Sequence, residues 1–553
     1  MVMPQELRDW QSAAWERIIS SGTADYLQVA CPGAGKTALA LHVARYYLER
    51  NDIARVVIVT PTEHLKEQWA EAATRHNIHL DPHWQGERPE GPNFDGLVVT
   101  YAHMGHGNNP IWHRRFCQRP TLAIFDEIHH SANERTWGEG IQKGFENAWR
   151  RLSLSGTPFR SDNIAISFVK YDENQRSVPD GDSYGYADAI REGVCRPVIF
   201  PGYEGTLTYQ YRGEVVTRTF DSEVSEQEHR TRLRTALDPR GQWLPTILKE
   251  ANQTLAELRN GPDPDAGGLI LAMNQRHAHA ISGLVEKSTG IIPAVVVSDD
   301  PKASQIIDQF KASSRPWIIA VKMVSEGVDI PRLRVEVYAT NTMTEMFFRQ
   351  AMGRIVRMRP EPEEQDAYMF FPDDPILRGF AEQIREERDH ILWDIEPDEG
   401  PAPGGEHTPE DDSFIGAEAQ MGHIVYENDS LTPAEMENAT NALVAIGVQS
   451  NLRDKAIAAK LLRKWNPSEN EPIIHTGPPR WQIKRTLKQN LWNKVNVLHY
   501  ATGKTKSHKS IYSDLKVQCG EWASNTDNLD ILKNMITTVQ GWINDCRGIT
   551  TTG

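Results

Sequence analysis

Two clusters of short, strongly apolar segments constrain the fold of this sequence more than any other feature. The first cluster lies within residues 26–157 and the second within 268–371, and stretches long enough for helices separate the segments. Apolar runs of this length, rich in Val and Ile and alternating with helices, are typical of parallel sheets buried on both faces. The pattern predicts an α/β fold with two parallel sheets. The expected strands are 26–30, 55–60, 96–101, 121–127 and 151–157, then 268–273, 294–298, 317–323, 335–339 and 367–371.

The remaining segments predict how the chain is divided. Residues 205–220 indicate a hairpin that turns at Arg212-Gly213, and residues 396–412 are rich in Pro, Gly and acidic residues, as flexible linkers are. After this linker, Thr432 to Glu435 has the spacing of a capping box and opens a helix. The expected domains are 1–200 with the first sheet, 201–395 with the second sheet and the hairpin, the linker 396–412, and a mainly helical domain 413–553.

Composition excludes several classes of protein. No apolar run approaches the ~20 residues that cross a bilayer, and the N-terminus lacks the features of a signal peptide, so a cytoplasmic location and no membrane partner are expected. The five cysteines form no C-x-x-C pair, which argues against a disulfide framework and a zinc site. The net charge of −15 means that any nucleic-acid site must be a local basic surface.

A glycine-rich loop follows the first expected strand. Glycines in such a turn let main-chain N–H groups converge on an anion at the start of a helix, which predicts a phosphate site. Lys36 is expected to reach the β- and γ-phosphates of a nucleotide, and the hydroxyl of Thr37 to bind Mg²⁺. Ala30 stands where the usual motif has its first glycine. The nucleotide-contacting residues expected in this loop are Pro32, Gly33, Ala34, Gly35, Lys36 and Thr37.

A pair of carboxylates ends a second apolar strand about 90 residues further on. Asp126 is expected to hold Mg²⁺ with Thr37, and Glu127 to take the proton of an attacking water. This combination indicates a nucleotide hydrolase. The neighbouring His129 and His130 do not indicate a shared zinc site, since adjacent side chains point apart.

The loop and the Asp126-Glu127-Ile128-His129 motif, in this order, resemble superfamily 2 helicases of the DExH type. Further matches support the resemblance from residue 5 to about 372. Gln11 resembles the family's adenine-reading glutamine, and His129, Ser155 and Thr157 resemble its coupling residues. The motifs similar to strand-binding ones contain Pro61, Thr62, Gln68, Thr100, Tyr101 and Ser325, and those similar to the second domain's nucleotide motifs contain Gly327, Asp329, Gln350, Arg354 and Arg357.

The resemblance implies two RecA-like domains and a nucleic-acid-stimulated ATPase that uses ATP and Mg²⁺. Lys36, Asp126, Glu127, Gln350, Arg354 and Arg357 would then be catalytic. Arg354 and Arg357 would supply positive charge from the second domain to the transferred phosphoryl group. The motifs are closer to those of phage and bacterial repair and branch-migration helicases and restriction-motor subunits than to DEAD-box proteins. DNA is the expected partner, and an RNA helicase or a motor in a defence or restriction complex is the alternative.

A basic stretch near the C-terminus is the second candidate for nucleic-acid binding. Residues 472–513 contain no Asp or Glu, although the whole chain is acidic. Leu487, Leu491, Val495 and Leu498 have helical spacing and predict a buried stripe, which places Lys484, Arg485 and Lys488 on or beside an outward face. The interleaved aromatic residues Trp481, Trp492, Tyr500 and Tyr512 are either stacking platforms or core residues.

Overall fold

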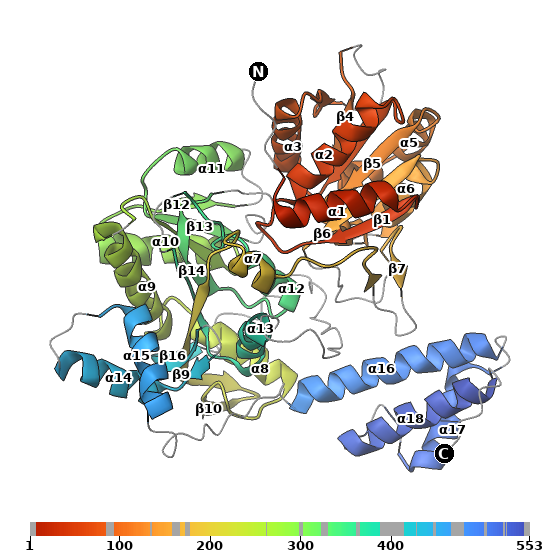
Figure 1. Cartoon of the computed structure of the whole chain (residues 1–553). Coiled ribbons are helices and arrows are strands. Elements are labelled where there is room, and N and C mark those ends of the chain that lie inside the picture. The colour runs from red at the N-terminus through yellow and green to blue at the C-terminus, as the bar shows by residue number, and fades with distance from the viewer. Residues whose placement is uncertain are drawn as a thin grey trace.

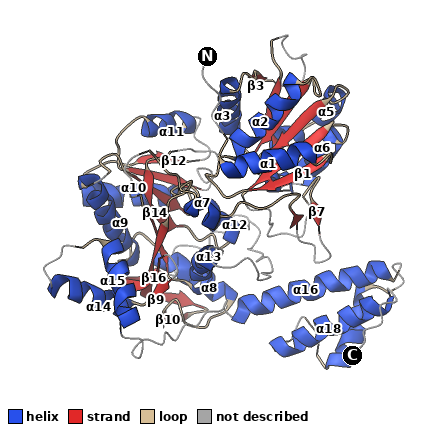
Figure 2. Ribbon diagram, in the orientation of Figure 1, coloured by secondary structure: helices blue, strands red, loops and turns tan. Residues whose placement is uncertain are grey.

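The computed structural model shows two sheet-containing lobes and a separate group of C-terminal helices (Figure 1). Figure 2 shows that helices flank the strands in both lobes. The structure describes residues 7–84, 93–132, 135–156, 166–171, 177–261, 263–297, 302–321, 330–360, 365–386, 414–426, 429–445, 450–465, 480–502, 506–521, 523, 526 and 528–546.

The first lobe contains a six-stranded sheet in the order β1-β6-β5-β2-β4-β3, and all of its pairs are parallel. Alternate residues of β2 enter two different apolar cores, so the sheet is covered on both faces, as the sequence predicts. The strands are β1 (Asp25–Val29), β2 (Arg55–Thr60), β3 (Leu80–Asp81), β4 (Gly96–Thr100), β5 (Thr121–Phe125) and β6 (Arg150–Ser155). The helices are α1 (Asp9–Ser20), α2 (Lys36–Glu49), α3 (Glu63–Arg75), α4 (Tyr101–Met104), α5 (Asn109–Phe116), the 3₁₀ turn η1 (Ile128–Ala132) and α6 (Arg135–Phe145).

The second lobe contains a nine-stranded mixed sheet in the order β12-β13-β11-β14-β15-β9-β16-β17, with β10 paired to β9. All ten strands expected from the sequence are present in the two sheets. The strands here are β9 (Val198–Tyr211), β10 (Glu214–Arg218), β11 (Gly267–Ala272), β12 (Ala294–Val296), β13 (Trp317–Val321), β14 (Leu333–Ala339), β15 (Ala367–Pro372), β16 (Phe414–Tyr426) and β17 (Asp429–Leu431). The helices of residues 186–465 are α7 (Tyr186–Arg191), α8 (Glu226–Ala236), α9 (Trp243–Asn260), α10 (Gln275–Thr289), α11 (Ala303–Lys311), α12 (Glu345–Met352), α13 (Pro375–Glu386), α14 (Pro433–Ala445) and α15 (Leu452–Trp465), and β7 (Lys170–Tyr171) pairs with β8 (Ser177–Val178).

The expected hairpin is confirmed, and its first strand is longer than predicted. Arg212 and Gly213 both have positive φ, the geometry of a tight two-residue hairpin turn. The first residues of β9 run parallel to β15, its last residues pair antiparallel with β10, and β16 pairs antiparallel with β9 over most of its length. β9 therefore joins the parallel and antiparallel parts of the second sheet.

The expected domain start at residue 413 needs correction. β16 pairs antiparallel with β9, so the chain that follows the linker returns to the second sheet. The capping box of α14 is confirmed, because the main-chain N–H of Thr432 donates to Glu435 and the N–H of Glu435 donates back to the Thr432 hydroxyl. Residues 414–465 thus belong with the second lobe, and the sequence missed this because β16 contains no β-branched run like those of the parallel strands.

The C-terminal helices α16 (Arg480–Ala501), α17 (His508–Cys519) and α18 (Leu529–Cys546) share a core of their own. The predicted stripe on α16 is confirmed, with Leu491, Val495 and Leu498 buried and Leu487 partly buried. Residues of α18 complete this core. Within the described part of the chain, no helix combines the length and apolar character needed to span a membrane.

Candidate active site

The glycine-rich loop joins β1 to the first residue of α2. Gly33 and Gly35 have φ values of +83° and +98°, in the left-handed region that favours glycine, and Gly35 is the N-cap of α2. The turn brings main-chain N–H groups to the positive end of the helix, which is the geometry that binds phosphate. The loop predicted from the sequence is therefore present.

Lys36 faces the carboxylate of Glu127 across this loop. Its ammonium lies 2.9 Å from Glu127 Oε1 and donates to the main-chain oxygen of Ala30 at 3.1 Å. The main-chain N–H of Gly156 donates to Glu127 Oε2 at 3.1 Å. Burial opposes the charge of Glu127, but Lys36 and His129 outweigh it and lower the pKa of Glu127 to about 2. Glu127 is held ionised at the end of the loop.

Asp126 differs from its neighbour because burial outweighs the nearby positive charges of Lys36 and His130. Burial, reinforced by the charge of Glu127, raises the pKa of Asp126 to about 6. Trp69 Nε1 donates to Asp126 Oδ2 at 2.8 Å, and the hydroxyl of Tyr101 donates to the main-chain oxygen of Asp126 at 2.9 Å. These two contacts fix the position of a carboxylate that a bound cation would stabilise.

A chain of polar contacts connects the two lobes at this site. His129 Nδ1 lies 3.2 Å from the hydroxyl of Ser155 and 3.6 Å from Glu127 Oε2. On the other side of the same ring, Nε2 lies 3.3 Å from the amide nitrogen of Gln350, on α12 of the second lobe. The expected coupling residue His129 therefore contacts both Ser155 of the first lobe and Gln350 of the second.

Arg357 approaches the glycine-rich loop from the second lobe. Its Cγ atom would lie 3.5 Å from a Cβ on Gly33, and Gly353 would bring a Cβ to 2.4 Å from the Cβ of Pro32. The main chain of Arg357 bridges to that of Cys195, and burial lowers the pKa of the guanidinium to about 10. The absence of a side chain at Gly353 allows this close approach.

Residues 5–160 match the family model described as "Type III restriction enzyme, res subunit". Protein ML1624 of Mycobacterium leprae, described as uncharacterized, is 37% identical over 565 residues, which cover 97% of this chain and 93% of that protein. The chain belongs to the family of this mycobacterial protein. The family-model match confirms the resemblance to superfamily 2 helicases related to restriction motors.

Two more distant similarities are to a DNA translocase and to a restriction-enzyme subunit. A protein of Sulfurisphaera tokodaii named "DNA 3'-5' translocase XPB2" is 23% identical over 377 residues, which cover 64% of this chain and 79% of that protein. Among solved structures, the fragment of a putative HsdR subunit of a type I restriction enzyme from Vibrio vulnificus is similar with a TM-score of 0.48 and 16% identity. That alignment covers 68% of this chain and 65% of the other.

Two residues of this helicase-family site hold the loop from α1. The guanidinium of Arg8 donates to the main-chain oxygen of Ala34 at 2.8 Å, and Gln11 Nε2 donates to that of Gly35 at 2.9 Å. Gln11 thus lies beside the loop. Arg8 lies in the segment that resembles the glutamine motif, but only Gln11 was given a role there. Trp69 was not singled out, because its contact depends on how α3 packs.

The residues of the first lobe that were expected to bind a nucleic-acid strand lie at or near the starts of α3 and α4, and one of them is buried. Thr62 is the N-cap residue of α3 and follows Pro61 at the end of β2, and Gln68 contacts His64 one turn away. Thr100 caps α4 by accepting from the N–H of His103. Tyr101 is fully buried and supports Asp126, so its side chain is not a surface contact, contrary to the expectation.

Several expected residues cannot be placed. Thr157, Ser325, Gly327 and Asp329 lie outside the described residues, and the side chain of Arg485 on α16 is not described.

Arg354 lies in the turn after α12, near the buried carboxyl of Glu336. Burial raises the pKa of Glu336 to about 8, against the opposing charge of Arg354.

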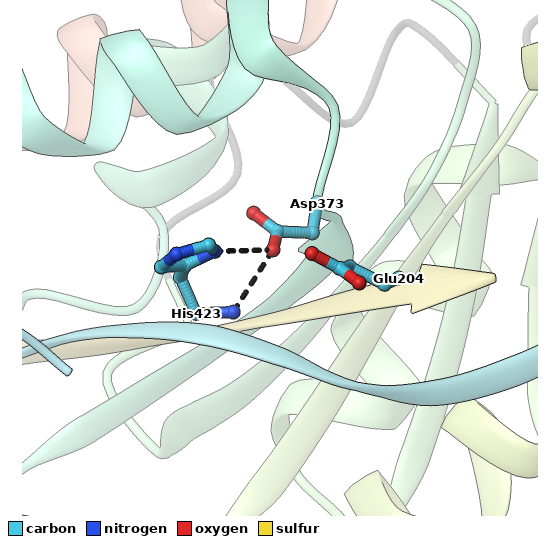
Figure 3. Close-up of side chains that lie close together, drawn as sticks. All are labelled: Glu204, Asp373 and His423. Atoms are coloured by element: carbon cyan, nitrogen blue, oxygen red, sulfur yellow. Dashed lines mark hydrogen bonds and ion pairs between the residues drawn. The ribbon is translucent and has the colours of Figure 1, made fainter. Parts of the chain in front are cut away.

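A second cluster of ionisable side chains lies away from the loop, in the second lobe. Figure 3 shows Glu204 and His423 beside Asp373, with ligand atoms within 4.8 Å of one another. However, Arg378 Nε donates to Asp373 Oδ1 at 2.7 Å, and the main-chain N–H and Nδ1 of His423 both lie 2.9 Å from Oδ2. Asp373 is therefore occupied by protein partners, and the cluster is better explained as an ion-pair network that ties β16 to the end of β15.

Proposed function

We propose that this chain is an ATP-dependent DNA helicase or translocase of superfamily 2. The observation that carries the proposal is the contact between the lobes at the glycine-rich loop. Lys36 and Glu127 come from the first lobe, and Gln350 and Arg357 reach the same place from the second. A nucleotide held there would touch both lobes, so that its hydrolysis changes how they fit together.

The ion pair between Lys36 and Glu127 suggests how the site responds to a nucleotide. The β- and γ-phosphates would compete with Glu127 for the ammonium of Lys36. Loss of that partner would raise the pKa of Glu127 from about 2 and make its carboxylate a better proton acceptor. Glu127 would then take the proton of the attacking water, and Arg357 would stabilise charge on the phosphoryl group.

The residues present fit a magnesium ion. Asp126 and Thr37 offer oxygen ligands, which Mg²⁺ prefers, and the raised pKa of Asp126 is that of a buried carboxylate without enough neighbouring positive charge. When bound, the ion would neutralise charge on the nucleotide phosphates. Trp69 and Tyr101 would keep the Asp126 carboxylate in place for it.

DNA is the proposed nucleic acid, and the name of the Sulfurisphaera relative supports this choice. The test measures ATPase activity with single-stranded DNA, double-stranded DNA and RNA as activators. It is followed by strand displacement on 3′-tailed, 5′-tailed and forked duplexes. Stimulation by DNA with strand displacement supports a helicase, and stimulation without displacement supports a translocase. Stimulation by RNA alone would reject the proposed substrate.

A motor subunit of a restriction or defence complex is the second candidate, because the matched family model describes a restriction-enzyme subunit. Within the described residues, the one cluster of three ionisable side chains that could hold a metal has Asp373 occupied by Arg378. Any cutting of DNA would then come from another chain. Strand cleavage by the purified chain alone, with ATP and Mg²⁺, would contradict this arrangement.

The contact between Pro32 and Gly353 gives a test of the lobe interface. Gly353→Ala places a methyl group 2.4 Å from the Pro32 side chain and should separate the lobes. We expect ATP turnover to fall about 10²-fold, since a displacement of catalytic groups by about 1 Å has effects of that size. Gly379→Ala, where nothing lies within 4 Å, is the matched control. Equal ATPase rates in the two variants would contradict a catalytic role for this contact.

The basic face of α16 is proposed as an accessory DNA-binding surface that selects forked or branched substrates. Lys484 and Lys488 are half-buried one turn apart on this helix, and Trp492 is 48% exposed beyond them. Replacing both lysines by Gln should weaken binding to forked DNA and lower the slope of log Kd against log salt by about 2, one unit for each lost phosphate contact. Lys516→Gln with Lys533→Gln is the matched control. An unchanged salt slope in a gel-shift titration would reject this surface.

A further inference from the structure

Two cysteines meet where the second lobe touches the glycine-rich loop. Cys31 lies in the loop, directly before Pro32, and its side chain is close enough to that of Cys195 for each thiol to shift the pKa of the other. The thiol of Cys195 lies 3.6 Å from the main-chain oxygen of Pro32 and would lie 3.5 Å from a Cβ on Gly33. The two residues are 164 positions apart in the sequence, and nothing in the chemistry proposed above uses their thiols.

The main chain of Cys195 belongs to the second lobe's side of this contact. Cys195 bridges to Arg357, and the N–H of the next residue, Arg196, donates to the main-chain oxygen of Val356 at 2.7 Å. The guanidinium of Arg196 also donates to the main-chain oxygen of Arg357. A covalent bond between the two thiols would therefore join the loop to the segment that carries Arg357.

The surroundings shift the pKa values of the two thiols in opposite directions. The Cys31 thiol, together with the charges of Arg8 and Arg357, lowers the pKa of Cys195 against the effect of burial. The Cys195 thiol and burial raise the pKa of Cys31. A thiolate reacts with oxidants much faster than a thiol, so Cys195 is the reactive member and Cys31 is placed to react with its product.

We propose that Cys31 and Cys195 are a modification site, a thiol pair that hydrogen peroxide converts to a disulfide linking the glycine-rich loop to the second lobe. The Cys195 thiol first releases its proton; the thiolate then attacks one peroxide oxygen, the O–O bond breaks, and Cys195 sulfenic acid and a hydroxide ion result, which takes up the released proton to give a first water. The Cys31 thiol then attacks the sulfenic sulfur, an S–S bond replaces the S–O bond, and a second water leaves. Two electrons pass from the thiols to peroxide. Both thiols are buried in the closed contact, so separation of the lobes admits the oxidant.

The first test is independent of any activity. The full-length reduced protein is treated with hydrogen peroxide, excess oxidant is removed, free thiols are blocked, and proteolytic peptides are mapped by mass spectrometry. The expected product is a Cys31–Cys195 cross-linked peptide that has lost two hydrogen atoms and that dithiothreitol separates. Cys195→Ser should abolish it, whereas Cys117→Ser, at a buried cysteine in the other core of the first lobe, should leave it intact. Blocked free thiols or separate sulfinic acids at positions 31 and 195 would overturn the proposal.

The second test rests on the proposed function. The disulfide should reduce DNA-stimulated ATPase activity at least about tenfold, because the lobes can no longer move through the catalytic cycle, and dithiothreitol should restore it. Absence of ATPase activity in the reduced protein would reject the proposed function, while the peptide map would still decide whether the disulfide forms. Full activity in the cross-linked protein would show that the bond does not restrain the lobes, and would reject a regulatory role for it.

Discussion

Replacing Glu127 with glutamine is expected to lower the rate of ATP hydrolysis by about 10²–10⁴-fold, the contribution of a well-placed general base. The amide keeps the size of the side chain but cannot accept the proton of water. It also removes the negative charge that pairs with Lys36 at 2.9 Å, so nucleotide phosphates meet less competition for the ammonium. ATP binding should therefore be retained or strengthened while turnover is lost. Steady-state ATPase assays and nucleotide titrations measure the two effects separately.

Two further variants make the result on Glu127 interpretable. Lys36→Ala should lose both nucleotide affinity and turnover, because it removes a phosphate-binding cation. Glu139→Gln, at an exposed ion pair with Lys143 on α6, should behave as the unaltered protein. If Glu127→Gln kept more than about a tenth of the activity, Glu127 would not be the general base, and another group would have to activate the water.

Replacing Asp373 with asparagine is expected to destabilise the second lobe strongly. The carboxylate is fully buried and accepts from Arg378 and His423, so its loss leaves a buried guanidinium without its main counter-ion. Breaking a buried ion pair in this way costs about 3–5 kcal/mol. Urea denaturation should show the loss. Asp530→Asn, at a side chain 85% exposed in an ion pair with Lys533, should change the unfolding free energy by about 0.5 kcal/mol or less.

The stabilisation by Asp373 should decrease both at low pH and at high pH. Despite burial, His423 and Arg378 lower the pKa of Asp373 below its usual 3.8, so its contribution is lost as pH falls through the lower folded value. The hydrogen bond to Asp373 raises the pKa of His423 above 6.5, so its contribution is complete below 6.5 and is lost as pH rises through the folded value. The difference in unfolding free energy between the unaltered protein and Asp373→Asn should be largest between the pH at which Asp373 becomes protonated and the pH at which His423 loses its proton. A constant difference from pH 4 to pH 9 would contradict the role of His423.

Much of the fold could be predicted because parallel strands buried on both faces leave long apolar runs. β2 and β5 are such runs, and each was predicted to within two residues. β16 could not be predicted, because it pairs antiparallel between β9 and β17 and mixes small, polar and apolar residues. β9 was recognised only as half of a hairpin, since its pairing with β15 depends on residues more than 150 positions away.

The candidate site could be predicted where a residue type is tied to a local turn. Gly33, Gly35 and Lys36 are of this kind, because only certain residues suit a phosphate-binding loop at the start of a helix. The contact of Cys31 with Cys195 could not be predicted, because it arises only when the second lobe closes on the loop. Tyr101 was misassigned because its hydroxyl turns inward to the main chain of Asp126.

The return of the chain to β9 affects how the protein is made. β9 ends at Tyr211 and its partner β16 begins at Phe414, so about 200 residues must be synthesised between them. At about 5–20 residues per second, the ribosome takes roughly 10–40 s to deliver the missing partner. During that interval the nascent chain carries an unsatisfied strand edge, which is the kind of surface that chaperones shield.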